Sequence, residues 1–207
     1  FKITMKQSLK SKATQDLILN KSFEMFYSNG FKSTNIPDIM RETSLSKGAF
    51  YHHFKNKHEI GIKVIENIIT KRIQDGFIVP LEDYKNKNIP ELLLYIFTER
   101  IKKFSEKEKE LGCPANNLIN EIGCSDSEFR ILLRNLIDSW QIALVKVLEF
   151  GKAKNQIHSN VNCSALATCL IGSFEGIRGI RKIYDNNQIF DNYIIGITHY
   201  INAIKKK

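Results

Sequence analysis

The chain has 207 residues, of which 43% are hydrophobic, and it carries 31 Lys and Arg against 22 Asp and Glu. Its length and apolar content allow one large or two modest domains with a buried core. No apolar run approaches the length of a membrane span, so we expect no membrane association and a cytoplasmic protein. Residues 1–63 hold 11 Lys and Arg and 5 Asp and Glu. This local positive charge predicts a polyanionic partner such as nucleic acid, unless it reflects a generally lysine-rich surface.

Residues 34–57 read as two short helices joined by a turn. Asn35 is suited to cap a first helix over residues 36–43, because its side chain can accept a hydrogen bond from an unpaired amide. Ser46 can cap a second helix that runs from Lys47 to about Phe54 in the same way. The pattern therefore predicts a helix-turn-helix.

The second of these helices has a polar face and an apolar face. The spacing predicts Lys47, Gly48, Tyr51 and His52 on the outside and Ala49, Phe50, His53 and Phe54 towards the core. Gly48 is a poor helix former, so we expect it where a nucleic-acid backbone or base edge needs the space. On spacing alone, an ordinary three-helix core with a solvated basic face would explain the same pattern.

A longer pattern surrounds this segment. The residues FYSNGFKST and then IPDIMRETSLSKGAFYHHFKNKHEI contain F-x-x-x-G-[FY]-x-x-[TS], S-x-G-x-[FL]-Y-x-H-F and K-x-x-[LI]. From about residue 13 to residue 64 the chain resembles the N-terminal DNA-binding domain of the TetR family of bacterial transcriptional regulators. Met40 departs from the family pattern, which usually has Ala at this position. The departure concerns the exact packing of the first short helix and not its role.

The resemblance implies an all-α protein whose partner is a double-stranded DNA operator. It implies a three-helix DNA-binding domain at residues 1–56 and a larger helical ligand-binding and dimerisation domain at residues 57–207. Three groups of DNA-contacting residues follow from it: Ser33, Thr34 and Asn35 at the phosphate-facing start of the first short helix; Ser44, Ser46, Lys47 and Gly48 in the major groove; and Tyr51, His52 and Lys57 on phosphates.

Beyond Lys57, apolar residues recur at helical spacing. A long helix should begin near Lys57 and end before Gly76 or Pro80. The further helices are predicted over residues 90–109, 115–122, 125 or 126 to about 154, 163–184 with Asn162 as the cap, and 190–204. We see no strand alternation and no internal repeat.

The last two predicted helices are rich in small residues. Gly172, Gly176 and Gly179 recur at near-helical spacing, which permits the close approach of another helix. In the family this position pairs with its twin in a four-helix dimer interface, so the resemblance implies a homodimer through the last two helices. An intrachain crossing of helices would use the same small residues.

A small-molecule effector is the second partner that the resemblance implies. Aromatic and apolar side chains of the central helices could line its cavity, with polar contacts from Asn117 or Glu121, although such a stripe is also typical of plain core. These candidate lining residues are Phe97, Phe104, Phe129, Leu133 and Trp140. The string GCPANNLINEIGCSDSEFR resembles the G-C-[PL]-x-x-x-L-x-x-E segment of a TetR subgroup that includes regulators of electrophile and quinone detoxification.

Cys113 therefore belongs among the candidate ligand-site residues. It precedes Pro114 at a predicted helix N-terminus, where the helix dipole would favour a reactive thiolate. A buried and inert thiol is the alternative, because free Cys is among the most buried residue types. The four cysteines lack C-x-x-C spacing, so we expect no zinc site, no other metal and no disulfide framework.

The sequence thus favours a DNA-binding regulator, released from its operator by a small molecule or an electrophile if it represses. We expect no cofactor and no enzymatic activity, because the nucleophile, zinc-hydrolase and phosphate-loop motifs are missing. One alternative is a helical ligand-binding or scaffold protein that does not read an operator. Catalysis in the C-terminal cavity is another, but no residue pattern calls for it.

Overall fold

The computed structural model describes residues 2–206, with side chains from residue 9 onward. The chain forms two compact units. The N-terminal unit contains the residues up to 71 and also residues 117–133, whereas the C-terminal unit contains residues 72–116 and 134–207. Regular structure in the described residues is helical, apart from an isolated bridge between Ile157 and Lys205. None of the described helices is both long and apolar enough to cross a membrane. The prediction of an all-α protein is confirmed.

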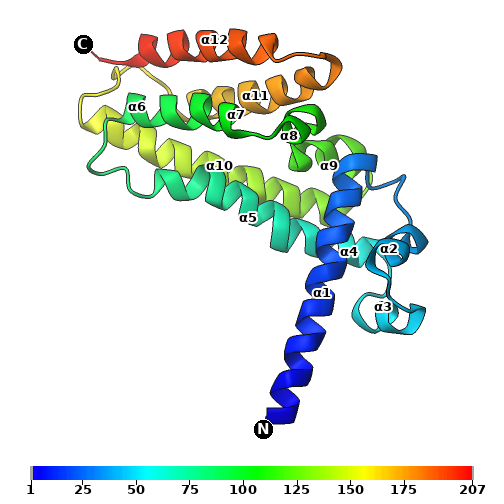
Figure 1. The fold of residues 1–207 in the computed structure, drawn as a ribbon. Helices are drawn as coiled ribbons and strands as arrows, with labels where there is room; N and C mark the ends of the chain where they lie inside the picture. The colour runs from blue at the N-terminus through cyan, green and yellow to red at the C-terminus, as the bar shows by residue number, and fades with distance from the viewer. Residues whose placement is uncertain (1, 207) are drawn as a thin grey trace. The chain divides into compact units, whose positions relative to one another are not determined.

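The N-terminal unit is built on one long helix and several short ones. Its elements are α1 (Lys2–Asn29), α2 (Ile36–Thr43), α3 (Lys47–His53), α4 (Lys57–Val64), the π-helical turn η1 (Ile65–Ile69), most of α9 (Pro114–Ile122) and the start of α10 (Ser127–Ala153). Helix α1 packs against α2 and α4 (Figure 1). The core includes Ile18, Phe26, Ile39 and Ile60.

Side-chain caps fix the beginnings of the short helices. Asn35 accepts a hydrogen bond from the N–H of Asp38 at 3.0 Å, and Ser46 accepts one from the N–H of Ala49 at 3.3 Å. Each cap satisfies one of the amides that a helix start leaves unpaired. Both caps were predicted from the sequence and are confirmed.

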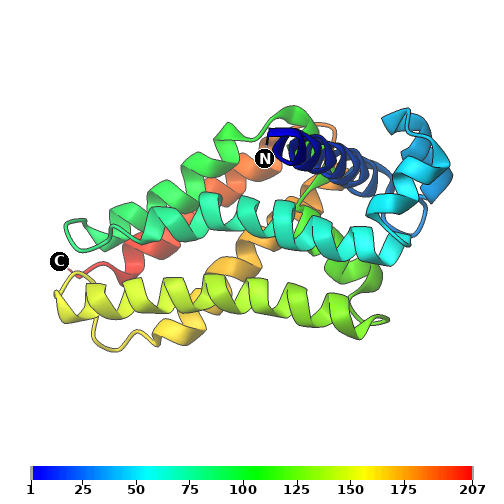
Figure 2. The same ribbon diagram turned by 90° about the horizontal axis from the view of Figure 1, so that it is seen from below.

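The C-terminal unit contains the remaining helices. They are the end of α5 (Thr70–Ile73), the π turn η2 (Gln74–Ile78), the 3₁₀ turn η3 (Val79–Leu81), α6 (Ile89–Leu94), the π turn η4 (Tyr95–Glu99), α7 (Arg100–Lys103), α8 (Glu106–Leu111), the rest of α10, α11 (Cys163–Ile180), the 3₁₀ turn η5 (Arg181–Ile183) and α12 (Gln188–Ile204). Helix α12 packs along α6 and η4 and against α11 (Figures 1 and 2).

Of the two ends predicted for the helix that begins at Lys57, the structure agrees with the one at Pro80. The helical path runs through Gly76 and ends at the 3₁₀ turn that contains Pro80. The helix predicted over residues 90–109 is interrupted at Phe104, whose ψ of 137° is extended. It restarts because Ser105 and Glu108 form a capping box, in which each side chain bonds the backbone N–H of the other.

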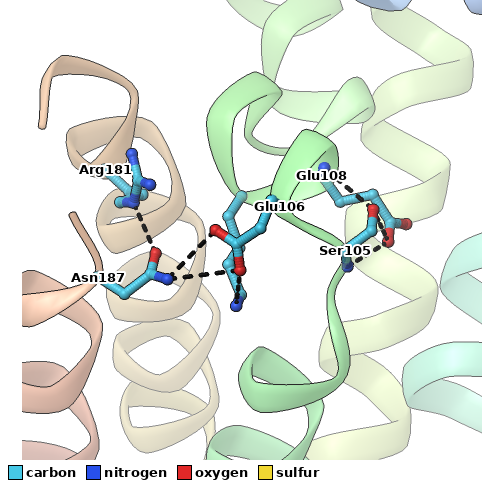
Figure 3. A network of polar contacts seen from close by, with 6 residues as sticks. Ser105, Glu106, Glu108, Arg181 and Asn187 are labelled. Atoms are coloured by element: carbon cyan, nitrogen blue, oxygen red, sulfur yellow. Dashed lines mark hydrogen bonds and ion pairs between the residues drawn. The ribbon is translucent and has the colours of Figure 1, made fainter. Parts of the chain in front are cut away.

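A polar network holds α8 against the turn η5 that follows α11 within the C-terminal unit (Figure 3). Nε of Arg181 donates to the side-chain oxygen of Asn187 at 2.9 Å, and the amide of Asn187 donates to Glu106 of α8 at 3.3 Å. Glu106 also pairs with Lys109 at 2.6 Å. Arg181 is buried, so its hydrogen bonds replace those it would make with water. The network thus joins α8 to the turn η5 and to the residue that precedes α12.

Candidate functional sites

Helix α3 is anchored by aromatic side chains and presents polar ones to solvent. Phe50 is 0% exposed and Phe54 is 1% exposed, so they fix the helix against the core of its unit. Lys47, Tyr51 and His52 are exposed on the opposite side. The prediction that Ala49 points inward was wrong, because Ala49 is exposed in the first turn.

Gly48 leaves the backbone of α3 bare. A Cβ atom added at this position would have no neighbouring atom within 4 Å, so packing inside the protein does not require glycine here. Glycine costs roughly 0.5–1 kcal/mol relative to alanine inside a helix. The first turn of α3 therefore offers an open surface that a molecule outside the chain can approach closely.

The turn before α3 adds further exposed polar groups. Ser44 caps the end of α2 in the left-handed conformation, with φ of 54°, and its side chain is exposed. Ser46, Ser33 and Asn35 are also exposed, the first and last while serving as helix caps. The exposed members of the predicted DNA-binding set thus lie in α3, in the turn before it and in the segment before α2.

Two members of the predicted set are engaged inside the protein. Thr34 is 1% exposed, and its hydroxyl donates to the carbonyl of Gly30 at 2.8 Å. Nζ of Lys57 donates to the carbonyls of Phe31 at 2.9 Å, Lys32 at 3.2 Å and Thr34 at 2.8 Å. Burial lowers the pKa of Lys57.

The three bonds use all the donors of an ammonium group, so Lys57 is not available to a phosphate as the resemblance implied. Its role is to tie the loop between α1 and α2 to the start of α4. Sequence alone could not distinguish Lys57 from the nearby Lys55, which is exposed directly after α3. The sequence pattern did not identify Lys55 as a candidate for binding phosphate.

The same loop is held from its other side by Glu121 of α9. The two carboxylate oxygens accept hydrogen bonds from the N–H groups of Phe31 at 2.8 Å and Lys32 at 2.6 Å. Gly30 adopts φ of +89°, and a Cβ there would lie only 3.2 Å from Glu121 Oε1. Glycine suits this position because it adopts a positive φ without strain, and its missing Cβ leaves room for the carboxylate. Glu121, predicted as a ligand contact, instead clamps the α1–α2 loop.

A second link joins α4 to the start of α10. Nε2 of His58 lies 2.9 Å from Oδ2 of Asp126, while Oδ1 of Asp126 accepts the N–H groups of Glu128 and Phe129 at 3.0 Å each. The hydrogen bond from Phe129 lowers the pKa of Asp126, and His58 adds to the effect. The ring of Phe129 also packs edge-on against Phe31 at 5.2 Å.

The structure therefore divides the predicted ligand-binding residues between the two units. Asn117, Glu121, Phe129 and Leu133 belong to the N-terminal unit, and Phe97, Phe104, Cys113 and Trp140 to the C-terminal unit. Within the C-terminal unit, Trp140 and Phe97 lie 6.3 Å apart and both contact Phe174. Phe174 and Phe77, which join this cluster, were not among the predicted residues.

Cys113 lies beside that cluster and is 2% exposed. Burial raises the pKa of its thiol to about 12, and the Glu175 carboxylate contributes to the rise. Desolvation thus raises the thiol pKa by more than the helix dipole at the start of α9 could lower it. Of the two alternatives, the structure supports the buried and inert thiol. Among the described residues, no group of His, Cys, Asp or Glu side chains is arranged to hold a metal ion.

Comparison with known families agrees with this architecture. The N-terminal model for bacterial regulatory proteins of the tetR family matches residues 18–61, which include α2 and α3. The model for the tetracyclin repressor-like C-terminal domain matches residues 92–196, slightly more than half of the chain. The chain belongs to the TetR family.

Two relatives of this TetR-family protein cover much of its length. It is 32% identical over 131 residues to an HTH-type transcriptional regulator from the lacX 3' region of Lactococcus lactis subsp. lactis, over 62% of this chain and 64% of the relative. It is 24% identical over 177 residues to the HTH-type transcriptional repressor DhaR of Mycobacterium sp. strain GP1, over 86% of each protein. The chain thus spans just under two thirds of the first relative.

The fold also matches solved structures. A TetR transcriptional regulator from Chloroflexus aurantiacus superposes with a TM-score of 0.82 over 95% of this chain and 98% of that one, at 22% identity. The likeness confirms the predicted arrangement of an N-terminal helix-turn-helix domain and a helical C-terminal domain. The family is one of regulators, which agrees with the expectation that the TetR-family chain is not an enzyme.

Proposed function

We propose that this regulator binds a DNA operator as a homodimer, represses transcription there and is released by a small-molecule effector. The observation that carries the proposal is the surface of α3. Phe50 and Phe54 hold the helix in place, Gly48 bares its backbone, and Lys47 and Tyr51 are exposed. A recognition helix needs this combination of fixed position and accessible N-terminal residues.

In the proposed complex, α3 enters the major groove with Ser44, Ser46, Lys47 and Gly48 near the bases. Ser33, Asn35, Tyr51, His52 and Lys55 would bind the flanking phosphates. Thr34 and Lys57 act indirectly, because their bonds keep α2 and α4 in position. The exposure of the first two groups of side chains supports this assignment. Replacing the buried Thr34 or Lys57 should instead affect the stability of the fold.

The homodimer interface that we propose is formed by α11 and α12. Apolar side chains are exposed along these helices and the turn between them, where Ile180 is 48%, Ile183 81% and Ile195 58% exposed. A Cβ added to Gly172, Gly176 or Gly196 would have no neighbour within 4 Å. Bare helix surface flanked by isoleucines suits close packing against a second copy. Two α3 helices related by a two-fold axis would then read half-sites about 34–36 Å apart.

Effector release would use α9 as the connection. In sequence, α9 begins in the C-terminal unit at Pro114 and carries Glu121 in the N-terminal unit. A ligand that shifts the start of α9 would therefore pull on the carboxylate that holds the α1–α2 loop. Displacing that loop would disturb α2 and α3 and weaken several DNA contacts together.

The relatives support repression, because DhaR is named as a transcriptional repressor. A regulator of this kind acts on chromosomal DNA, so we place it in the cytoplasm. Its effector site is proposed in the C-terminal unit, around Phe97, Phe104 and Trp140, where the aromatic cluster lies.

Fluorescence anisotropy over a salt series tests the proposal, with duplexes from around the protein's own gene and scrambled duplexes of the same composition. We expect tight binding to a native duplex alone, lost in Lys47→Ala and Tyr51→Ala and retained in Lys85→Ala, which removes an exposed lysine of the C-terminal unit. Equal and weak binding to all duplexes would count against the operator and favour a helical ligand-binding or scaffold protein.

A further inference from the structure

Several buried polar atoms of the C-terminal unit lack a hydrogen-bond partner among the described residues. They are three N–H donors: Nε of Arg100, Nε1 of Trp140 and Nε of Arg178. Two neighbouring polar groups have partners within the chain, because Glu175 interacts with the Cys113 thiol and Tyr193 with Ser173. Buried polar atoms are bonded in the great majority of protein structures, because leaving one unbonded costs free energy. An accumulation in one region indicates that their partner comes from outside the chain.

Aromatic rings join these residues into one cluster. The guanidinium carbon of Arg100 lies 4.7 Å from the ring centroid of Phe77, which is 4.4 Å from that of Trp140. The guanidinium carbon of Arg178 lies 4.4 Å from the centroid of Phe104. Phe174 completes the cluster, with centroid distances of 6.0 Å to Trp140, 6.3 Å to Phe104 and 6.5 Å to Tyr193.

Positive charge exceeds negative charge within this cluster. The two guanidinium groups of Arg100 and Arg178 face a single carboxylate, Glu175, which approaches Nη1 of Arg178 only to 3.9 Å and whose pKa is raised by burial. Burial and the nearby Arg178 both lower the pKa of Arg100, as expected for two cations that share a site. The pair formed by Arg72 and Glu108 also faces Arg100 but is internally balanced.

The backbone is shaped to admit Arg100. A Cβ at Gly76 would collide with the guanidinium of Arg100, so the glycine leaves the space that this guanidinium occupies. Gly76 lies in the π turn η2, and Arg100 follows directly after the π turn η4. Turns of this kind occur frequently at functional sites. The other guanidinium is fixed by a 2.7 Å hydrogen bond from Nη2 of Arg178 to the carbonyl of Gly112.

We propose that this cluster binds a small organic carboxylate with an apolar or aromatic body. Arg100 and Arg178 hold the carboxylate, and the rings of Phe77, Phe104 and Phe174 contact the body. Guanidinium is the group best suited to a buried carboxylate, because its fork of N–H donors matches the two oxygens. The proposal rests on the effector site of the proposed function, but it names the chemical class that this site accepts.

Isothermal titration calorimetry on the full chain, without DNA, tests this specificity. The probes are benzoate, phenylacetate and butyrate, each compared with its primary amide. We expect at least one acid to bind about tenfold or more tightly than its amide, which keeps the shape but loses the charge. Arg100→Met and Arg178→Met should each lower the affinity for that acid about 10- to 100-fold. Arg134→Met, which removes an exposed arginine of the same unit, should leave its affinity unchanged.

Equal affinities for acid and amide would overturn the proposal, as would an absence of binding by every probe at millimolar concentration. Acid binding that survives both Arg100→Met and Arg178→Met would overturn it too. The comparison of acid with amide uses the unaltered chain, so it tests the proposal even if a variant does not fold. Gly76→Ala provides a milder change, which should lower the affinity for the acid because the added methyl group displaces Arg100. Loss of operator binding with preserved acid selectivity would contradict the proposed function alone.

Discussion

Glu121 binds Phe31 across 90 positions of the sequence, through a 2.8 Å hydrogen bond from the Phe31 N–H to the carboxylate. Its other oxygen accepts the N–H of Lys32, while Lys57 bonds the carbonyls of the same residues. The loop between α1 and α2 is thus held by an anion on its amides and a cation on its carbonyls. Since the loop leads directly into α2, this arrangement couples α9 to the DNA-binding helices.

Glu121→Gln tests the clamp. The side-chain amide of glutamine retains one acceptor oxygen, but its NH₂ group would face the second backbone N–H. One charge-assisted hydrogen bond is therefore lost. We expect a decrease of about 1–3 kcal/mol in the free energy of unfolding and weaker operator binding. Urea denaturation and anisotropy measure the two effects, with Glu110→Gln as an exposed control. Unchanged stability would show that the loop does not depend on the carboxylate.

Lys55 and Lys57 provide a matched pair for separating phosphate binding from structural support. Replacing Lys55 by Met should reduce the slope of log affinity against log salt by about 0.9 for each phosphate that the protein no longer neutralises, hence about 1.8 for a dimer. Lys57→Met should leave that slope unchanged but lower the free energy of unfolding by about 1–3 kcal/mol, because three carbonyls lose a charged donor. The reverse pattern would restore Lys57 as the phosphate ligand.

Gly48→Ala should separate stability from function. Since the added methyl group meets no atom of the protein, α3 should gain roughly 0.5–1 kcal/mol from the better helix former. The same methyl group would stand between α3 and the DNA, so we expect weaker operator binding. Ala49→Gly, at the next exposed position, should lower stability instead. Thermal denaturation and anisotropy on each variant compare the two effects. An operator affinity that rises with stability would place the DNA elsewhere.

The sequence predicted features that depend on neighbours along the chain. Asn35 and Ser46 were identified as caps because a cap needs only its own side chain and an amide three residues ahead. The roles of Lys57 and Glu121 depend on a loop that lies 23 to 90 positions away, and no local pattern distinguishes a clamped lysine from an exposed one. The same limit applies to Gly76, whose need is set by Arg100.

Asp126 should make stability depend on acidity. Hydrogen bonds lower its pKa in the folded state, so its stabilising effect is complete above the unfolded value of about 3.9 and disappears as the pH falls through the lower folded pKa. We expect Asp126→Asn, which keeps the capping oxygen, to reduce stability at pH 6 and to differ less from the unaltered protein at pH 3. Urea denaturation from pH 3 to 6 measures this difference. Asp185→Asn is the exposed control, and a difference that grows in acid would contradict the assignment.

The dimer interface can be tested by placing charge on its proposed surface. Ile195 of α12 is 58% exposed in the single chain, and Ile142 of α10 is 69% exposed. If α11 and α12 pair with a second copy, Ile195→Asp would bury a carboxylate in an apolar interface, whereas Ile142→Asp would leave its carboxylate in water. Sedimentation equilibrium should therefore show monomers for Ile195→Asp and dimers for Ile142→Asp at micromolar concentration.

Because operator affinity requires both half-sites, Ile195→Asp should also bind the operator at least tenfold more weakly, a decrease of about 1.4 kcal/mol or more in binding free energy. Dimers that persist in Ile195→Asp but dissociate in Ile142→Asp would move the interface to α10.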